Sequence, residues 1–382
     1  MRISIHTLGT RGDVQPYVAL ALGLIAAGHE VDLAAPAQFE DFVTSHGVGF
    51  SALPREFLEL MEDPEAKAAM AGSKGGFAVG LKMLKKVGPV MLNLFDRQWE
   101  AARAFEPDLI VFHPKALAAP HIAEKLRVRA ILASPLPGFT PTAAFPSPIL
   151  SKPLPRFFNR MSHDLMAGSS SVLFNRPMRR WRQSALGLPS RSAMPPLRDL
   201  PTLYAYSPAV LPVPPEWGPN VLVSGYWFLD EGADWTPSAD LAAFLAAGPP
   251  PVYVGFGSMP TADPAAMTAE LVEAIRLSGQ RAVLASGWAK LGGVDLPDSI
   301  HLLDSAPHDR LFPLMSAVVH HGGAGTTAAG LRAGKPTVIC AYFGDQPFWG
   351  RRVAEIGAGP APLTASTMTP SALAEAIRTA AA

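Results

Sequence analysis

Residues 1–35 read MRISIHTLGTRGDVQPYVALALGLIAAGHEVDLAA and contain the parts of one βαβ unit. The apolar runs Arg2–Thr7 and Glu30–Ala35 predict two strands. Between them, Tyr17–Ala27 has the apolar spacing of an amphipathic helix, and Pro16 suits its first turn. Two strands joined by a helix over so short a stretch predict a parallel sheet.

The same alternation continues along the chain. Strands are expected at Asp108–Phe112 and Ala130–Ala133, with a helix at His121–Leu126 between them. After proline-rich residues 208–219, the expected strands are Pro251–Phe256, Arg281–Ala285, Ile300–Leu303, Ala317–Val319 and Thr337–Cys340. We therefore predict the α/β class, with two Rossmann-like, doubly wound parallel-sheet domains facing across a cleft. The predicted division is 1–208 for the first domain, 209–236 for a linker and 237–382 for the second domain.

The composition narrows the possible partners and compartment. The 382 residues include 32 basic and 32 acidic side chains, and this zero net charge argues against a nucleic-acid partner. A single cysteine, Cys340, cannot form an internal disulfide and fits a reducing cytoplasm. The sequence shows neither a secretory signal nor a run of ~20 apolar residues. We expect a cytoplasmic protein, with peripheral membrane contact as an open option.

The stretch His320–Thr327, HHGGAGTT, follows a predicted strand and precedes a predicted helix. Glycines allow close backbone approach to an anion, and a helix N-terminus offers unpaired N–H groups and a positive dipole end. Thr326 can cap the helix and donate its hydroxyl to a phosphate, while His321 adds a donor that is cationic if protonated. The alternative is a tight turn with a capping threonine. The adjacent histidines and three glycines favour a diphosphate site.

Several phosphate-binding and metal-binding patterns are missing from the sequence. There is no G-x-G-x-x-G after the first strand and no G-x-x-x-x-G-K-[ST], which argues against dinucleotide redox chemistry and a P-loop. There is also no Asp-x-Asp pair to hold a cation on a diphosphate. We therefore expect no cofactor and no metal, with backbone amides neutralising the anion.

Further candidate residues follow other predicted strands of the second half. Asp345 and Gln346 could bind sugar hydroxyls, or could simply cap the next helix. Ser258 could add a hydroxyl to the diphosphate. A flat indole such as Trp288 suits stacking on a nucleobase, although ordinary packing is an equal alternative. Residues 306–308, including Ala306 and His308, could read a pyrimidine edge through backbone groups.

In the first half, Asp13 follows Gly12 in a loop before the helix. A carboxylate there could act as a general base or could merely cap the helix. His113 comes at the end of strand Asp108–Phe112 and could assist or orient that base. His6 is more typical of a structural histidine within a strand.

Two segments are expected to lie outside the sheet. Residues 62–87 are rich in Gly, Ala, Lys and Met and favour helices with a mobile loop near a pocket mouth. Residues 135–155 are rich in proline and apolar side chains and favour a loop that lines an acceptor site. Plain surface connections are the alternative for both.

These motifs together resemble the UDP-glycosyltransferase superfamily with the GT-B fold, nearest the sterol-glucosyltransferase-like and bacterial antibiotic glycosyltransferase branch. The resemblance covers Met1 to about Ala382 and is carried by the stretches 9–16, 223–227, 255–258, 306–309 and 320–346. It implies an acceptor-binding first domain and a second domain that binds the nucleotide-sugar donor. The family's loop implies diphosphate binding by His321, Gly323, Gly325 and Thr326.

The resemblance also assigns roles to the remaining candidates. It implies that Ser258 contacts phosphate, that Asp345 and Gln346 bind the donor sugar, and that Asp13 is the catalytic base. Plant relatives pair their base with an aspartate where this chain has His113. They also stack uracil on a tryptophan where this chain has Ser305, which would leave base stacking to Trp288. Family members usually continue past the equivalent of Ala382 with a crossing helix, so the sequence is expected to be truncated or to close its domains differently.

The sequence thus predicts an inverting, metal-independent hexosyltransferase. Its donor would be a UDP-sugar, with glucose the favoured hexose and dTDP-sugar as an alternative, and its acceptor a hydrophobic hydroxyl compound such as a sterol or polyketide. A nucleotide-sugar epimerase and a non-catalytic sugar-nucleotide-binding or lipid-binding protein are the rival interpretations. The protein could be a monomer or a dimer. Six basic residues could form a face that docks on a membrane, although a plain solvated basic face is the favoured interpretation: Lys152, Arg156, Arg160, Arg179, Arg180 and Arg182.

Overall fold

The computed structural model describes residues 1–56, 76–150, 155–192, 196–230, 235–257, 263–286 and 296–382. The chain divides into two compact units. The first comprises Met1–Ala144, Phe158–Ser207 and Val213–Leu229, and the second comprises Phe145–Phe157, Pro208–Pro212 and Asp230–Ala382.

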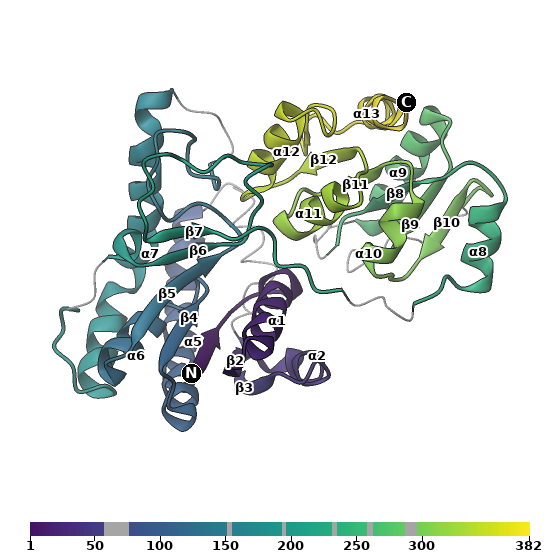
Figure 1. Cartoon of the computed structure of the whole chain (residues 1–382). Coiled ribbons are helices and arrows are strands. Elements are labelled where there is room, and N and C mark those ends of the chain that lie inside the picture. Colours follow the sequence, from purple (N-terminus) through teal and green to yellow (C-terminus); the bar gives the residue numbers. More distant parts are fainter. Residues whose placement is uncertain (57–75, 151–154, 193–195, 231–234, 258–262, 287–295) are drawn as a thin grey trace. The chain divides into compact units, whose positions relative to one another are not determined.

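The first unit contains a seven-stranded parallel sheet in the order β3-β2-β1-β4-β5-β6-β7 (Figure 1). Its strands are β1 Arg2–His6, β2 Glu30–Pro36, β3 Gly49–Leu53, β4 Leu109–Phe112, β5 Arg129–Ser134, β6 Thr202–Tyr204 and β7 Val221–Val223. Its helices are α1 Arg11–Ala26, α2 Glu40–Thr44, α5 Gly76–Phe105, α6 Ala119–Leu126 and α7 Arg156–Ser184, with short 3-10 turns at Ala37–Phe39 and Leu197–Asp199. The order reverses direction at β1, as in a doubly wound sheet.

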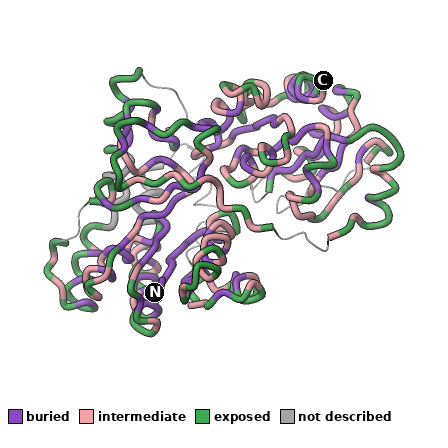
Figure 2. The backbone as a smooth tube through the Cα atoms, viewed as in Figure 1, coloured by how far each residue is buried: buried purple, intermediate pink, exposed green. Residues whose placement is uncertain are grey.

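The second unit contains a six-stranded parallel sheet in the order β10-β9-β8-β11-β12-β13. Its strands are β8 Val252–Gly255, β9 Ala282–Ala285, β10 Ile300–Leu303, β11 Val318–His320, β12 Thr337–Ala341 and β13 Leu363–Thr364. Its helices are α8 Ala239–Ala246, α9 Pro264–Ser278, α10 His308–Leu311, α11 Ala324–Arg332, α12 Gln346–Glu355 and α13 Pro370–Ala381, with a 3-10 turn at Phe312–Leu314. The strands are mostly buried while the helices alternate between buried and exposed faces, as Figure 2 shows. The predicted α/β class, with two doubly wound parallel-sheet domains, is confirmed.

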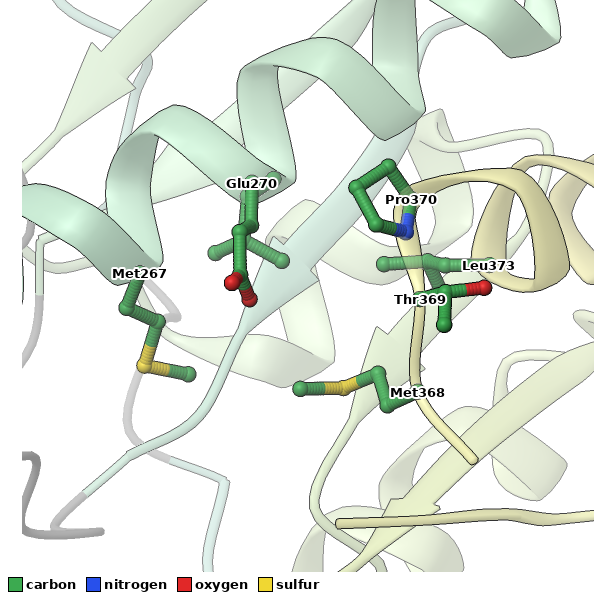
Figure 3. Close-up of a pocket in the computed structure, with 7 residues that line it drawn as sticks. Met267, Glu270, Met368, Thr369, Pro370 and Leu373 are labelled. Carbon is green, nitrogen blue, oxygen red and sulfur yellow. The ribbon is translucent and has the colours of Figure 1, made fainter. Parts of the chain in front are cut away.

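Between α9 and the start of α13 lies a small pocket, about 10 Å³ in volume (Figure 3). Met267, Met368 and Leu373 line it together with Glu270. A space of this size holds about one water molecule and is far below that of a ligand pocket. We regard it as a packing gap between the two helices.

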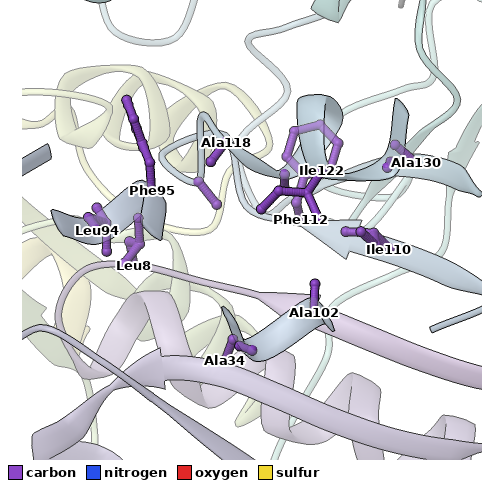
Figure 4. Close-up of a cluster of buried hydrophobic side chains, with 14 of the residues drawn as sticks. Leu8, Ala34, Leu94, Phe95, Ala102, Ile110, Phe112, Ala118, Ile122 and Ala130 are labelled. Atoms are coloured by element: carbon purple, nitrogen blue, oxygen red, sulfur yellow. The ribbon is translucent and has the colours of Figure 1, made fainter. Parts of the chain in front are cut away.

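Alternating side chains of the first sheet pack against helices on its two faces. On one face, Ile3, Ile5 and Leu33 of the sheet pack in one cluster with Val14 and Val18 of α1. On the other face, α5 and α6 cover a second cluster, part of which Figure 4 shows: Leu8, Ala34, Leu94, Phe95, Ala102, Ile110, Phe112, Ala118, Ile122 and Ala130. This period-two alternation is what a buried parallel strand requires.

The helix α1 begins earlier than the sequence suggested. Thr10 is its N-cap, and the Asp13 carboxylate accepts the Thr10 backbone N–H at 2.9 Å, so the two residues form a capping box. Pro16 therefore lies inside the helix, and the prediction that it occupies the first turn was wrong. Asp13 is in the first helical turn, where a carboxylate also interacts favourably with the helix dipole.

Two long helices were not anticipated at their full length. α5 starts at Gly76, so the end of the segment expected at 62–87 is helical, while residues 57–75 lie outside the described part. α7 spans 29 residues after the proline-rich stretch, and no helix was predicted there. Residues 135–150 form an irregular loop as expected. No helix in the described part of the chain combines the length and apolar character that a bilayer crossing requires.

Candidate functional site

The loop HHGGAGTT lies at the carboxyl end of β11, which pairs with β8 on one side and β12 on the other. Helix α11 follows directly, with Gly323 as its N-cap and no side-chain cap hydrogen bond. Thr326 is the third residue of the helix, so the expectation that it caps the helix was wrong. No threonine side chain caps the N–H groups of the first turn. These groups are therefore available to an anion, as at other anion sites formed by a helix N-terminus.

Glycine is required at some positions of this loop for steric reasons, but not at all of them. Gly322 has a φ of +91°, and a Cβ there would lie 2.6 Å from Ile339 Cγ2. A Cβ on Gly323 would lie 2.6 Å from His321 Nε2. Gly325 is exposed, and a Cβ there would meet no atom within 4 Å. Packing does not require glycine at 325, so the space beside its Cα is open to an approaching ligand.

Three polar side chains around the loop have buried atoms with no partner among the described residues: His320 Nε2, His321 Nδ1 and Thr327 Oγ1. His320 Nδ1 accepts the Gly322 backbone N–H at 2.9 Å, so its proton is on Nε2. Such buried polar atoms normally have a partner, and a bound anion would supply acceptors for the donors among them.

Burial also decides the charge of the two histidines. It lowers the pKa of His321 to about 4 and the pKa of His320 well below its usual value. His321 is therefore a neutral donor at pH 7 before any anion binds, rather than the cation that was considered. The helix N-terminus and neutral N–H groups supply the positive potential of this site.

Asp345 and Gln346 follow β12, one strand along from the loop. Gln346 is 5% exposed, and its Oε1 accepts the backbone N–H groups of Tyr342 and Phe343 at 2.8 and 3.2 Å. Asp345 is the N-cap residue of α12 without a side-chain cap bond, and its Oδ2 accepts Trp349 Nε1–H at 2.9 Å. Both side chains thus stabilise the turn between β12 and α12. A sugar bound to Asp345 or Gln346 would have to hydrogen-bond to side chains that already make these contacts.

The remaining donor-site candidates are only partly described. Ser258 and Trp288 lie outside the described residues. His308 stacks on Phe312 with ring centroids 4.3 Å apart, and Ala306 packs against the same apolar cluster. The suggested nucleobase contacts of residues 306–308 therefore stay predictions. Within the described ranges, no group of three His, Cys, Asp or Glu side chains is arranged to hold a metal ion.

In the first unit, Asp13 lies where the carboxyl ends of β1 and β4 meet. Its Oδ1 is 2.8 Å from Lys115 Nζ and 3.4 Å from His113 Nε2, while Oδ2 binds the Thr10 backbone. Gly9 has a φ of +133°, and a Cβ there would lie 2.0 Å from Asp13 Oδ2. The loop before α1 therefore requires glycine at this position to fit around the carboxylate.

His113 is held as a neutral hydrogen-bond donor. Its Nδ1 accepts the Lys115 backbone N–H at 3.0 Å, so the ring proton is on Nε2, which faces Asp13. Burial lowers the pKa of His113 to about 3 even though the nearby Asp13 raises it. The ring also meets Tyr17 edge-on at 5.8 Å. The structure thus brings His113 and Asp13 together, which the sequence left open.

The charge of Asp13 follows from its neighbours. Burial alone would raise the pKa of its carboxyl, but the Lys115 ammonium, the hydrogen bonds from Lys115 and Thr10 and the nearby N–H of neutral His113 outweigh burial and hold the pKa below its usual value. Asp13 is therefore ionised at neutral pH and can accept a proton. No sequence motif singled out Lys115 as a site residue. The sequence feature that could have identified it is a basic residue two positions after His113, just beyond the same predicted strand.

Arg182, one of the six residues predicted to form a basic face, is not at the surface. This side chain is buried and pairs with both oxygens of Glu124, at 2.8 and 3.0 Å. It is a structural ion pair and does not belong to a surface. Arg156, Arg160, Arg179 and Arg180 are exposed, and Lys152 lies outside the described residues.

Two family models match this chain, one in each half of the sequence. Residues 3–145 match the glycosyltransferase family 28 N-terminal domain, and residues 283–381 match the erythromycin biosynthesis protein CIII-like C-terminal domain. The chain is 38% identical to sterol 3-beta-glucosyltransferase UGT80B1 of Arabidopsis thaliana, covering 99% of this chain and 62% of that protein. It is 37% identical to the sterol 3-beta-glucosyltransferase of Neosartorya fischeri, covering 94% of this chain and 26% of that protein.

Solved structures agree on the fold. The glycotransferase of kitacinnamycin has a TM-score of 0.71 at 18% identity, covering 100% of this chain and 90% of that one. Glycosyltransferase VinC in complex with DTDP has a TM-score of 0.64 at 20% identity, covering 100% of this chain and 91% of that one. Two doubly wound parallel-sheet units of this kind define the GT-B fold. The chain is thus similar to the sterol 3-beta-glucosyltransferases over nearly its whole length, although it spans only 62% of the plant relative and 26% of the fungal one.

Proposed function

We propose that this chain is an inverting glycosyltransferase that moves glucose from UDP-glucose to the hydroxyl of a hydrophobic acceptor, of which a sterol is the leading candidate. The observation that carries the proposal is the ionised Asp13, held by Lys115 and His113 at the carboxyl edge of the first sheet. The homology to sterol 3-beta-glucosyltransferases supports the choice of sugar and acceptor.

In this reaction Asp13 accepts the proton of the acceptor hydroxyl while the acceptor oxygen attacks the anomeric carbon. The bond from that carbon to the diphosphate breaks on the opposite side, so the anomeric configuration inverts. The leaving diphosphate gathers negative charge, which the N–H groups at the start of α11 and the donors of His320 and His321 would stabilise. Because these N–H groups would stabilise the charge that a metal cation otherwise stabilises, we propose a metal-independent mechanism.

An unusual helix face supports an acceptor that resides in or near a membrane. The first turns of α7 bury polar side chains, since Asn159 and His163 donate inward to the Ala143 and Gly138 carbonyls. On the opposite face, Met161 is 57% exposed and Leu165 is 68% exposed. Arg160, next to Met161 in the chain, is also exposed. Apolar side chains beside a cation are typical of helices that contact a lipid surface. We therefore propose weak peripheral membrane contact through α7.

The deciding experiment incubates the protein with UDP-glucose or dTDP-glucose and a panel of sterol, polyketide and flavonoid acceptors. We expect UDP release that depends on a sterol acceptor, and a β-glucoside by NMR. Conversion of the donor to a second sugar nucleotide without acceptor would instead identify an epimerase. Donor binding with neither transfer nor conversion would identify a binding protein. Co-sedimentation with anionic liposomes, compared with the Met161→Ser/Leu165→Ser variant, tests the membrane contact.

A further inference from the structure

Lys115 touches both partners of the proposed catalytic pair. Its backbone N–H donates to His113 Nδ1 at 3.0 Å and fixes the histidine tautomer. Its side-chain ammonium donates to Asp13 Oδ1 at 2.8 Å. One residue just beyond β4 therefore orients the histidine and neutralises the carboxylate.

The two oxygens of Asp13 are held in different ways. Oδ2 is bound to the Thr10 backbone as part of the cap of α1, so it cannot leave without loosening the helix start. Oδ1 is held by His113 from the buried side and by Lys115 from the solvent side, because the histidine side chain is 8% exposed and the lysine side chain 45%. An incoming hydroxyl would reach Oδ1 by replacing the more exposed partner, Lys115.

The other polar and charged groups near Asp13 have their own partners. Arg11, also on α1, donates to Gln15 and lies over the Phe42 ring at 4.4 Å. The Tyr17 hydroxyl donates to the Ala133 carbonyl at 2.5 Å. Thr10 supplies its backbone N–H and a longer hydroxyl contact to Oδ2. Among the described residues, Lys115 is the lysine or arginine whose side chain contacts the carboxylate.

We propose that Lys115 is a positioning residue that holds Asp13 ionised and oriented in the resting site, yields Oδ1 to the acceptor hydroxyl, and returns to expel the proton after transfer. The proposal rests on the proposed function, with Asp13 as the base. During transfer the acceptor O–H bond breaks and its proton moves to Oδ1, while the new glycosidic bond forms and the diphosphate leaves. The returning ammonium makes protonated Asp13 a stronger acid, which gives its proton to water.

The first test is the pH dependence of kcat/KM for Lys115→Met. Without the ammonium, burial dominates and the pKa of Asp13 rises, so the acid limb of the profile is expected to move upward by roughly 1–3 pH units. Lys115→Arg keeps the charge and should leave the limb within about half a unit of wild type. Lys125→Met removes an exposed lysine on α6 and serves as the matched control. A uniform loss of rate at every pH, with an unmoved limb, would overturn the proposal.

A second measurement does not depend on turnover. Titration of the Asp13 side-chain ¹³C resonance by NMR, assigned by its loss in Asp13→Asn, reports the pKa in wild type and in Lys115→Met. We expect a clear rise in the variant, and equal values would refute the role of Lys115. If no donor and acceptor pair supports transfer, the proposed function fails while this titration still decides whether Lys115 controls Asp13. Unchanged circular dichroism is expected, since Lys115 is at the surface.

Discussion

His113 Nε2 lies 3.4 Å from Asp13 Oδ1 and carries the proton that points at it, because His113 Nδ1 accepts the backbone N–H of Lys115. The histidine therefore orients the carboxylate without competing for the proton that the reaction releases. This reverses the usual arrangement in which a histidine takes the proton and a carboxylate orients it.

Asp13→Asn is expected to lower the transfer rate by roughly 10²–10⁴-fold because the amide cannot take a proton. The amide oxygen can still accept the Thr10 N–H, so the helix cap and the fold are kept. Rates of sugar transfer and calorimetric binding of UDP measure the two effects separately. Binding of UDP within about twofold of wild type is expected, and turnover within tenfold of wild type would remove Asp13 from the mechanism.

Gly325→Leu is expected to weaken UDP binding at least about tenfold, or ~1.4 kcal/mol, while leaving the fold intact. A Cβ at this position would meet no atom within 4 Å, so the backbone has room for a side chain, which would then occupy the space expected for the diphosphate. Gly23→Leu is the matched control, because Gly23 is also an exposed helical glycine with no atom within 4 Å of a Cβ. Both substitutions should raise helix stability by up to ~1 kcal/mol. Wild-type UDP affinity in Gly325→Leu would contradict the diphosphate site.

Two substitutions can separate the structural role of Gln346 from its proposed role in binding the donor sugar. Gln346→Leu removes the acceptor of the Tyr342 and Phe343 N–H groups and should cost about 1–2 kcal/mol of unfolding free energy. Gln346→Glu keeps an acceptor for both N–H groups but lacks the amide donor and places a carboxylate at a largely buried position, so some unfolding free energy is lost at pH 7 while the KM for UDP-glucose rises. Denaturant unfolding and donor kinetics measure both. Equal KM values for wild type and Gln346→Glu would argue against sugar binding by the amide.

Buried histidines should make the protein sensitive to mild acid. The folded-state pKa is lowered from 6.5 to about 4 for His6 and His321 and to about 3 for His113, mainly by burial. Between pH 6.5 and 4 the unfolded chain binds more protons, so stability present above pH 6.5 is lost as the pH falls. Each such histidine contributes a slope of roughly 1 kcal/mol per pH unit near pH 5.5. His6→Gln should reduce the measured slope by that amount, and a flat stability from pH 7 to 5 would contradict the prediction.

Asp32 on β2 should show the opposite pH dependence. The residue is 7% exposed, its Oδ2 has no partner among the described residues, and burial raises its pKa. A raised folded-state pKa means that Asp32 contributes stability below the unfolded value of 3.8, which is lost as the pH rises. Asp32→Asn should therefore stabilise the protein on the order of 1 kcal/mol at pH 7. The gain should vanish near pH 3, and thermal unfolding at both pH values provides the comparison.

Some features escaped prediction for identifiable reasons. α7 has a buried polar face and an exposed apolar one at Met161 and Leu165, so the usual amphipathic pattern gave no signal. Pro16 suggested a helix start, but the Thr10–Asp13 capping box begins the helix one turn earlier. Arg182 belonged to a run of arginines in the sequence, yet its pairing with Glu124 buries it. Of these, only the burial of Arg182 depends on a partner far away in the chain, 58 positions distant.

The sequence alone determined the βαβ order, the parallel sheets and the glycine-rich turn at His320–Thr327, because these depend on local periodicity and backbone freedom. Only the tertiary structure assembled Asp13 with His113 and Lys115, which are about a hundred positions away in the chain. The register of β1 on β4, with His6 opposite Phe112, brings the residues after both strands to one edge of the sheet. Such pairing is set by the packing of the whole sheet between its helices, which no local pattern encodes.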